Sequence, residues 1–153
     1  MSVFVTLKDY LTDKIEALSS VQKVYGYEPE KLSGWPAVTV TLPTMEGEFS
    51  SNAEDSRVYG FTVRVYFPLG QDIETPKTMP REQYAENVIA TVLEDIANTI
   101  DTDFDLTDVT QSSNITVKFT EATDIRPIYI EMDGGWIRGA EISIRIYTEK
   151  TVV

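Results

Sequence analysis

The segment RVYGFTVRVYF, residues 57–67, carries an apolar side chain at every second position. These apolar positions are Tyr59, Phe61, Val63, Val65 and Phe67. A period of two, filled by β-branched and aromatic residues, predicts a strand that buries one face. The segment has the strongest strand pattern of the chain and predicts a β-sheet at the centre of the fold.

Further strand patterns lie on both sides of this segment. Before it, residues 21–27 predict a short strand, and residues 37–42 (AVTVTL) alternate aliphatic residues with threonine. After it, residues 115–120 predict a strand with Ile115, Val117 and Phe119 on one face. Residues 128–132 and 136–147 predict a hairpin, because Asp133-Gly134-Gly135 suits a tight turn.

Two amphipathic helices are expected among these strands. Thr6 followed by Asp9 has the pattern of a capping box, so the first helix should begin there and end near residues 19–20. The second should begin near Met79 and Pro80 and end in the Asp-rich residues 101–108. The apolar stripes are Leu7, Leu11, Ile15 and Leu18 in the first helix, and Tyr84, Val88, Val92, Leu93, Ile96 and Ile100, supported by Ala85 and Ile89, in the second.

The predicted order of elements is α-β-β-β-α-β-β-β. Strands that run together between two helices favour an α+β fold over a regular βαβ alternation. We therefore expect a mainly antiparallel β-sheet with two amphipathic helices packed on one face. The chain has 153 residues, 42% of them hydrophobic, which fits one domain over residues 1–153.

The composition excludes several classes of chemistry. The chain has no Cys and no His, so thiol nucleophiles, thiolate metal sites and histidine-based catalytic triads are absent. An enzyme of this composition would depend on carboxylates, Tyr, Lys or Arg. The prediction is that the protein is not an enzyme and has no catalytic residue, no cofactor and no metal site.

The charge balance bears on partners. With 13 basic and 25 acidic residues the net charge is −12, the wrong sign for holding nucleic acid or an anionic membrane. The N-terminal segment MSVFVTLKDY lacks the basic and apolar regions of a signal peptide. We therefore expect that the protein is made in the cytoplasm and does not associate with a membrane.

Two acidic motifs have a functional and a plainer interpretation. Asp101, Asp103 and Asp105 imitate the start of a calcium loop, but Leu106 and Ser112 stand where that loop needs Gly and Glu. An acidic exit from the second helix is the better interpretation. Glu131 and Asp133 could form a general acid–base pair, although chance proximity is common among 25 acidic residues.

Two long segments between the expected elements suit either contact with a partner or simple mobility. Residues 43–56 should form a long loop or a protruding hairpin, and residues 68–78 a second loop. Both contain apolar residues in polar surroundings, as docking segments do. Outward-facing Arg57, Arg64, Arg138 and Arg145 could contact an acidic segment of a neighbouring subunit, or lie on a solvated sheet face.

The layout of the whole chain resembles the tail terminator, or tail completion, proteins of long-tailed bacteriophages. The likeness lies in the N-terminal helix ending in KIEALSSVQKVYGY, the Trp-Pro before a strand in GWPAVTVTLP, the aromatic strand RVYGFTVRVYF, the helix REQYAENVIATVLEDIANTI and the closing strand WIRGAEISIRIY. The resemblance implies a structural virion protein that forms a hexameric ring at the head-proximal end of the tail tube. Such a ring stops tube polymerisation and offers a surface for joining the head.

The implied partners are further copies of this chain, the tail tube protein and a head-closure or connector protein, with DNA only passing through the lumen. A closed ring needs two different complementary patches on each subunit. The alternatives are another head–tail joining ring protein, or a small carboxylate-based enzyme or ligand-binding domain. The residues expected at a subunit or partner interface are Met45, Glu46, Glu48, Phe49, Glu54, Asp55, Arg57, Arg64, Leu69 and Ile73.

Overall fold

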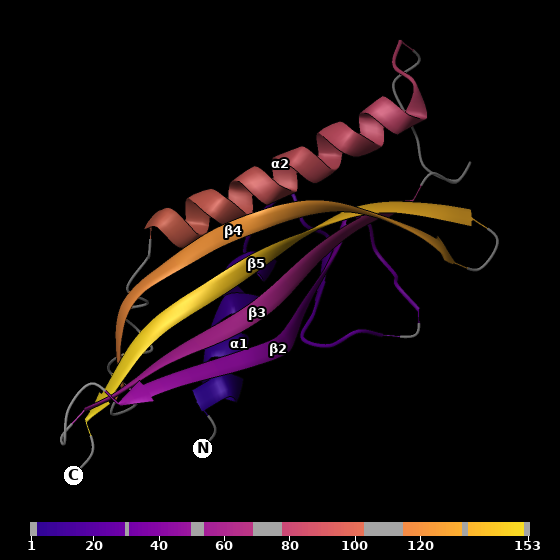
Figure 1. Ribbon diagram of the computed structural model, residues 1–153. Helices are drawn as coiled ribbons and strands as arrows, with labels where there is room; N and C mark the ends of the chain where they lie inside the picture. Colours follow the sequence, from indigo (N-terminus) through magenta and orange to yellow (C-terminus); the bar gives the residue numbers. More distant parts are fainter. Residues whose placement is uncertain are drawn as a thin grey trace.

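The computed structural model describes residues 3–29, 31–49, 54–68, 78–102, 115–132 and 135–151. Its elements follow the order α1 (Val3–Glu16), β1 (Lys23–Tyr25), β2 (Ala37–Phe49), β3 (Glu54–Pro68), α2 (Arg81–Thr102), β4 (Ile115–Met132) and β5 (Gly135–Thr151) (Figure 1). This is an α+β fold, as predicted.

The five strands form one sheet in the order β1-β2-β3-β5-β4. β1 pairs with β2 in parallel, and all the other pairs are antiparallel. The segment RVYGFTVRVYF lies in β3, the middle strand, with its apolar residues buried against the helices. Both outer strands, β1 and β4, have one edge that no other described strand covers.

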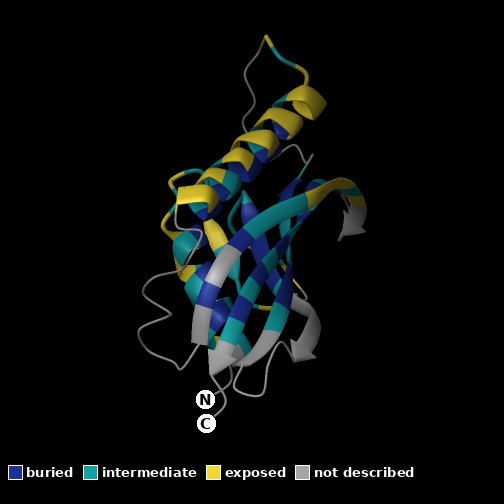
Figure 2. Ribbon diagram, turned by 60° about the vertical axis from the view of Figure 1, so that its left-hand side comes forward, coloured by how far each residue is buried: buried dark blue, intermediate teal, exposed yellow. Residues whose placement is uncertain are grey.

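Both helices pack on the same face of the sheet, as the sequence predicts (Figure 2). Leu7, Leu11 and Ile15 of α1 are buried against it. In α2 the buried residues are Ala85, Ile89, Val92, Leu93, Ile96 and Ile100, whereas Tyr84 and Val88 of the predicted stripe are half-buried beside the core. This rotation of the buried stripe leaves one flank of α2 apolar and partly open.

The start of α1 was predicted wrongly. The helix already begins at Val3, so Thr6 lies inside it and does not cap it. The ring of Phe4 packs edge-to-face on Tyr59 and Phe61, with centroids 4.8 and 6.1 Å apart. These contacts fix the first turn to the sheet, which explains why local capping chemistry does not set the boundary. α2 begins as predicted, since the Tyr84 N–H donates to the Pro80 carbonyl.

The two strands predicted over residues 115–132 are one strand, β4. Two β-bulges, between Val117 and Phe119 and between Thr123 and Arg126, each add one residue to β4 opposite β5. Asp124 in the second bulge has φ 55°, which Asp tolerates. A bulge on an edge strand accommodates an extra residue without ending the strand. The break predicted between residues 120 and 128 was therefore wrong. The uninterrupted alternation predicted over residues 115–120 was also wrong, because the first bulge lies inside it.

The described residues 43–49 and 54–56 lie on the paired strands β2 and β3, so the hairpin alternative is confirmed for them and the loop alternative is wrong. β2 runs to Phe49 and β3 starts at Glu54. A bulge between Thr41 and Thr44 puts one extra residue into β2. Beyond the bulge, Met45 is in register with Tyr59. The hairpin is extended because β5 continues along it as far as Thr151.

Candidate functional site

An apolar groove of about 600 Å³ lies between the N-terminal half of α2 and the chain around β1. We call it the β1 groove. Half-buried Trp35, Pro36, Met79, Tyr84 and Val88 form its walls together with buried Phe67. Its polar rim consists of Ser20, Gln22, Asn87 and Thr91.

A short hydrogen-bonded turn holds Trp35 at this groove. The Trp35 N–H donates to Oε1 of Gln22 over 2.7 Å, and the Gln22 N–H donates to the Pro36 carbonyl over 3.1 Å. Gly34 takes φ 78°, a conformation that favours glycine, and the Trp35–Pro36 peptide bond is cis. At the other end, Asn87 Nδ2 donates to Sδ of Met79 over 3.6 Å.

The chemistry of the β1 groove is that of a binding surface. Its described lining contains no carboxylate, lysine or arginine that could transfer a proton or hold an anion. Trp, Tyr, Phe and Met side chains are enriched in the centres of protein interfaces, where they bury large areas. The groove therefore suits an apolar segment of a partner better than a reaction.

A second apolar surface lies on the other flank of α2, at the β4 edge of the sheet. Ile125 and Tyr129 of β4 are 58% and 60% exposed, and Pro127 stands exposed between them. We call these three residues the β4 ridge. They border a smaller hollow of about 220 Å³, whose α2 wall is Glu86, Ile89, Ala90 and Leu93. The β4 ridge is thus an exposed apolar surface, whereas the β1 groove is a hollow one.

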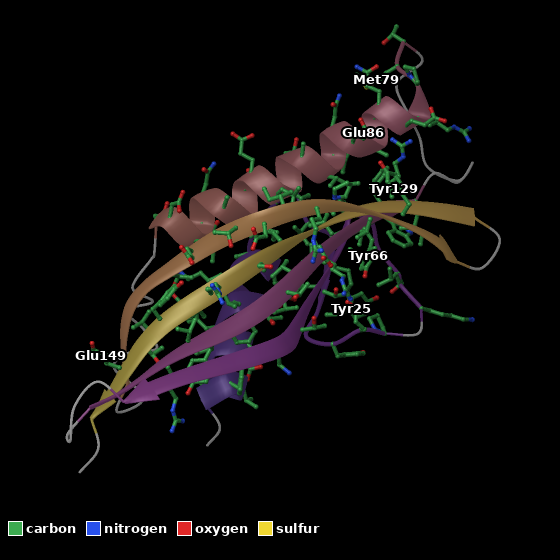
Figure 3. All side chains as sticks on the ribbon, viewed as in Figure 1. Tyr25, Tyr66, Met79, Glu86, Tyr129 and Glu149 are labelled. Atoms are coloured by element: carbon green, nitrogen blue, oxygen red, sulfur yellow. The ribbon has the colours of Figure 1, made fainter. Side chains whose placement is uncertain are left out.

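Arg138 of β5 supports the ridge from the helix-covered side. Its Nη1 donates to Oε1 of Glu86 over 2.6 Å, and its guanidinium lies 5.5 Å from the centre of the Tyr129 ring. Figure 3 shows Glu86 and Tyr129 near one end of the molecule, with Glu149 near the other. Arg138 thus pairs within the chain on the helix side, which corrects its expected outward position.

Arg64 also has its partners within the chain. On the face of the sheet away from the helices, it donates from Nε to Oε2 of Glu141 and from Nη1 to Oε1 of Glu28, over 3.1 Å each. Arg126 Nη2 lies 2.8 Å from the other oxygen of Glu141. We call Glu28, Arg64, Glu141 and Arg126 the open-face network. Arg64 is therefore already paired with two carboxylates of its own chain.

Tyr66 joins the open-face network through its hydroxyl group, which donates to Oε2 of Glu28 over 3.3 Å. Burial, followed by the negative charge of Glu28, raises the pKa of Tyr66 above its ordinary value. The folded protein therefore holds this proton more tightly than the unfolded chain does. The resulting stabilisation is complete below pH 10 and is lost as the pH rises through the folded-state pKa.

Tyr66→Phe is expected to reduce the loss of stability between pH 9 and 11, because the variant has no phenol to ionise at this position. The free energy of unfolding, from urea titrations at each pH, measures this. Tyr27→Phe, at a ring that is 62% exposed, is the matched control. Identical pH slopes for wild type and Tyr66→Phe would contradict the assignment.

The other predicted interface residues lie apart from the two apolar surfaces. Met45, Glu46, Glu48, Phe49, Glu54 and Asp55 are on the paired backbone of the β2–β3 hairpin, and Arg57 follows on β3. Leu69 and Ile73 lie outside the described residues, as do Asp103, Asp105 and Asp133. The register places Arg57 opposite Gly47, between Glu46 and Glu48, on the same hairpin as Glu54 and Asp55. Arg64 lies farther along β3, in the open-face network.

The sequence prediction missed the ridge and most of the groove. Ile125 and Pro127 fell between the strands predicted over residues 115–120 and 128–132, and Tyr84 and Val88 were assigned to the core. One signal of the groove was present in the sequence. Tyr84 and Val88 make the apolar face of α2 wider than the single stripe that packs on a sheet, so part of that face could be expected to stay exposed.

Within the described ranges, no three carboxylates lie together as a metal site would need. None of the described helices is long and apolar enough to cross a membrane.

No protein-family model matches the chain, and no curated protein matches it. Among solved structures, 31 chains match. One of them is 12% identical, with a TM-score of 0.37, over 93% of this chain and 91% of the other. Likeness at this level leaves the function to be argued from the residues of this chain.

Proposed function

We propose that the protein is a structural subunit of a phage tail, a tail terminator that assembles into a ring at the head-proximal end of the tail tube. The ring stops polymerisation of the tube and provides the surface to which the head joins. In this role the protein acts in the virion, after synthesis in the host cytoplasm, and binds no cofactor.

One observation carries the proposal: two unlike apolar surfaces lie on the two flanks of α2, a hollow bordered by the chain before β1 and a projection from β4. Two unlike surfaces on one subunit suit a heterologous, head-to-tail contact, and such contacts close into rings when the rotation permits. Exposed apolar surface of this kind marks interaction sites. The net charge of −12 further suits a lumen through which DNA slides.

Another ring of the head–tail joint, a connector or head-closure protein, would use the same edges. Electron micrographs of the protein mixed with tail tubes separate the roles. A terminator caps one end of each tube and keeps tube length constant, whereas a connector ring binds the head vertex and leaves tube ends bare.

The first test is the mass of the free protein in solution. Light scattering on a sizing column, across concentration and salt, is expected to give a particle of about six times 17.2 kDa, with a central hole in negative stain. A monomer at every concentration, with tubes left uncapped, contradicts the proposal.

A further inference from the structure

We propose that the β4 ridge of one subunit docks into the β1 groove of the next copy of this chain. This inference rests on the proposed ring and names the contact that builds it. Ile125 and Tyr129 are the inserted side chains, and Trp35, Met79 and Tyr84 form the receiving walls.

The dimensions of ridge and groove agree. Ile125 and Tyr129 are four residues apart on β4, which places them about 13 Å apart at a strand rise of 3.3 Å per residue. The groove follows α2 from Tyr84 to Thr91, about 10 Å at 1.5 Å per residue, and continues past Met79. Its volume of about 600 Å³ accepts two large side chains.

The charges beside the two surfaces are complementary. Exposed Lys23 and Lys31 lie at or beside the β1 edge. At the β4 edge, Arg126 and Arg138 already contact Glu141 and Glu86, and Asp124 beside them is exposed. Docking the ridge into the groove brings Asp124 toward the lysine side, whereas two ridges facing each other would bring two copies of Asp124 together. The charges therefore favour a second copy in head-to-tail orientation over a two-fold dimer.

Side chains rather than backbone make this contact. The bulge at Asp124 and the ring of Pro127 interrupt the regular row of donors on the outer edge of β4. β1, with three residues, offers little edge for pairing. Aromatic and aliphatic anchors in an apolar groove are the usual centres of binding energy at interfaces.

Cross-linking between single-cysteine variants tests the contact, and the cysteine-free chain gives a clean background. Ile125→Cys and Asn87→Cys place one thiol on the ridge and one on the groove rim. A mixture of the two, treated with a short bis-maleimide, is expected to yield a covalent dimer, and each variant alone should yield none. Ile125→Cys mixed with Asn98→Cys is the matched control, because Asn98 is equally exposed on α2 but lies outside the groove.

A substitution on the ridge provides the second measurement. Tyr129→Asp is expected to raise the protein concentration needed for assembly about tenfold or more. Tyr27→Asp, at a ring of equal exposure outside both surfaces, should leave assembly unchanged. Thermal melting of the unassembled chain should be the same for both variants, which separates assembly from folding.

The outcomes distinguish the two proposals. Rings that form without cross-linking above the control, or that tolerate Tyr129→Asp, overturn the ridge-in-groove contact and leave the ring function standing. A monomer at every concentration, with tail tubes left uncapped, overturns both. Cross-linked dimers together with weakened assembly of Tyr129→Asp support the contact.

Discussion

Gly139→Ala is expected to lower the free energy of unfolding by about 3 kcal/mol, the upper end of the usual cost of overpacking. A Cβ atom at this position would lie 2.5 Å from the Val65 carbonyl oxygen and 2.9 Å from Cγ1 of Ile128. Both neighbours are fixed, since β5 lies between β3 and β4 and is paired along both edges. The chain cannot make room without breaking the ladder next to Tyr66.

Urea denaturation of wild type, Gly139→Ala and Gly26→Ala measures this effect. Gly26 is the matched control, because a Cβ there would meet its nearest atoms at 3.8 Å, an ordinary contact. Its substitution should change stability by no more than about 0.5 kcal/mol. Equal midpoints for the two variants would show that the sheet adapts at Gly139.

Arg64→Glu is expected to cost about 2 kcal/mol of folding stability at neutral pH, because it removes two charge-assisted hydrogen bonds and places three carboxylates together. The Arg64 side chain is 36% exposed and that of Glu141 14%, so solvent screens the repulsion only in part. Thermal melting at pH 7 measures this loss.

Lys31→Glu is the control for this reversal, since Lys31 is exposed and its charge change is the same. An equal melting temperature for the two variants would contradict a structural role for Arg64. Because Arg64→Glu acts within the chain, loss of assembly in this variant would not identify a subunit contact. The ridge variant Tyr129→Asp is the more direct probe of the interface.

The architecture could be predicted because its signals are periodic. Alternation over residues 57–67 and 142–146, and helical spacing from Leu7 to Ile15, report burial directly and identify strands, helices and the core. The antiparallel character of the sheet and the common face of the helices followed from the order of these elements. The antiparallel pairing of β4 with β5 was predicted from the turn chemistry of residues 133–135.

The remaining features depend on tertiary partners that local patterns do not encode. Asp124 and Pro127 look like a strand break, yet pairing with β5 carries β4 through them. Thr6 looks like a cap, yet the packing of Phe4 on β3 starts the helix earlier. The partners of Arg64 and Arg138 come from residues 28, 141 and 86, and the sequence gives no spacing rule that joins them.

The bulge between Thr41 and Thr44 gives β2 one residue more than the facing stretch of β3. Deleting that extra residue would restore one-to-one pairing and leave Met45 opposite Tyr59. A deletion between Met45 and Phe49 would instead move the residues beyond it to the opposite face of the sheet. Among homologous chains, single-residue gaps in this arm should therefore fall at the bulge and not between Met45 and Phe49.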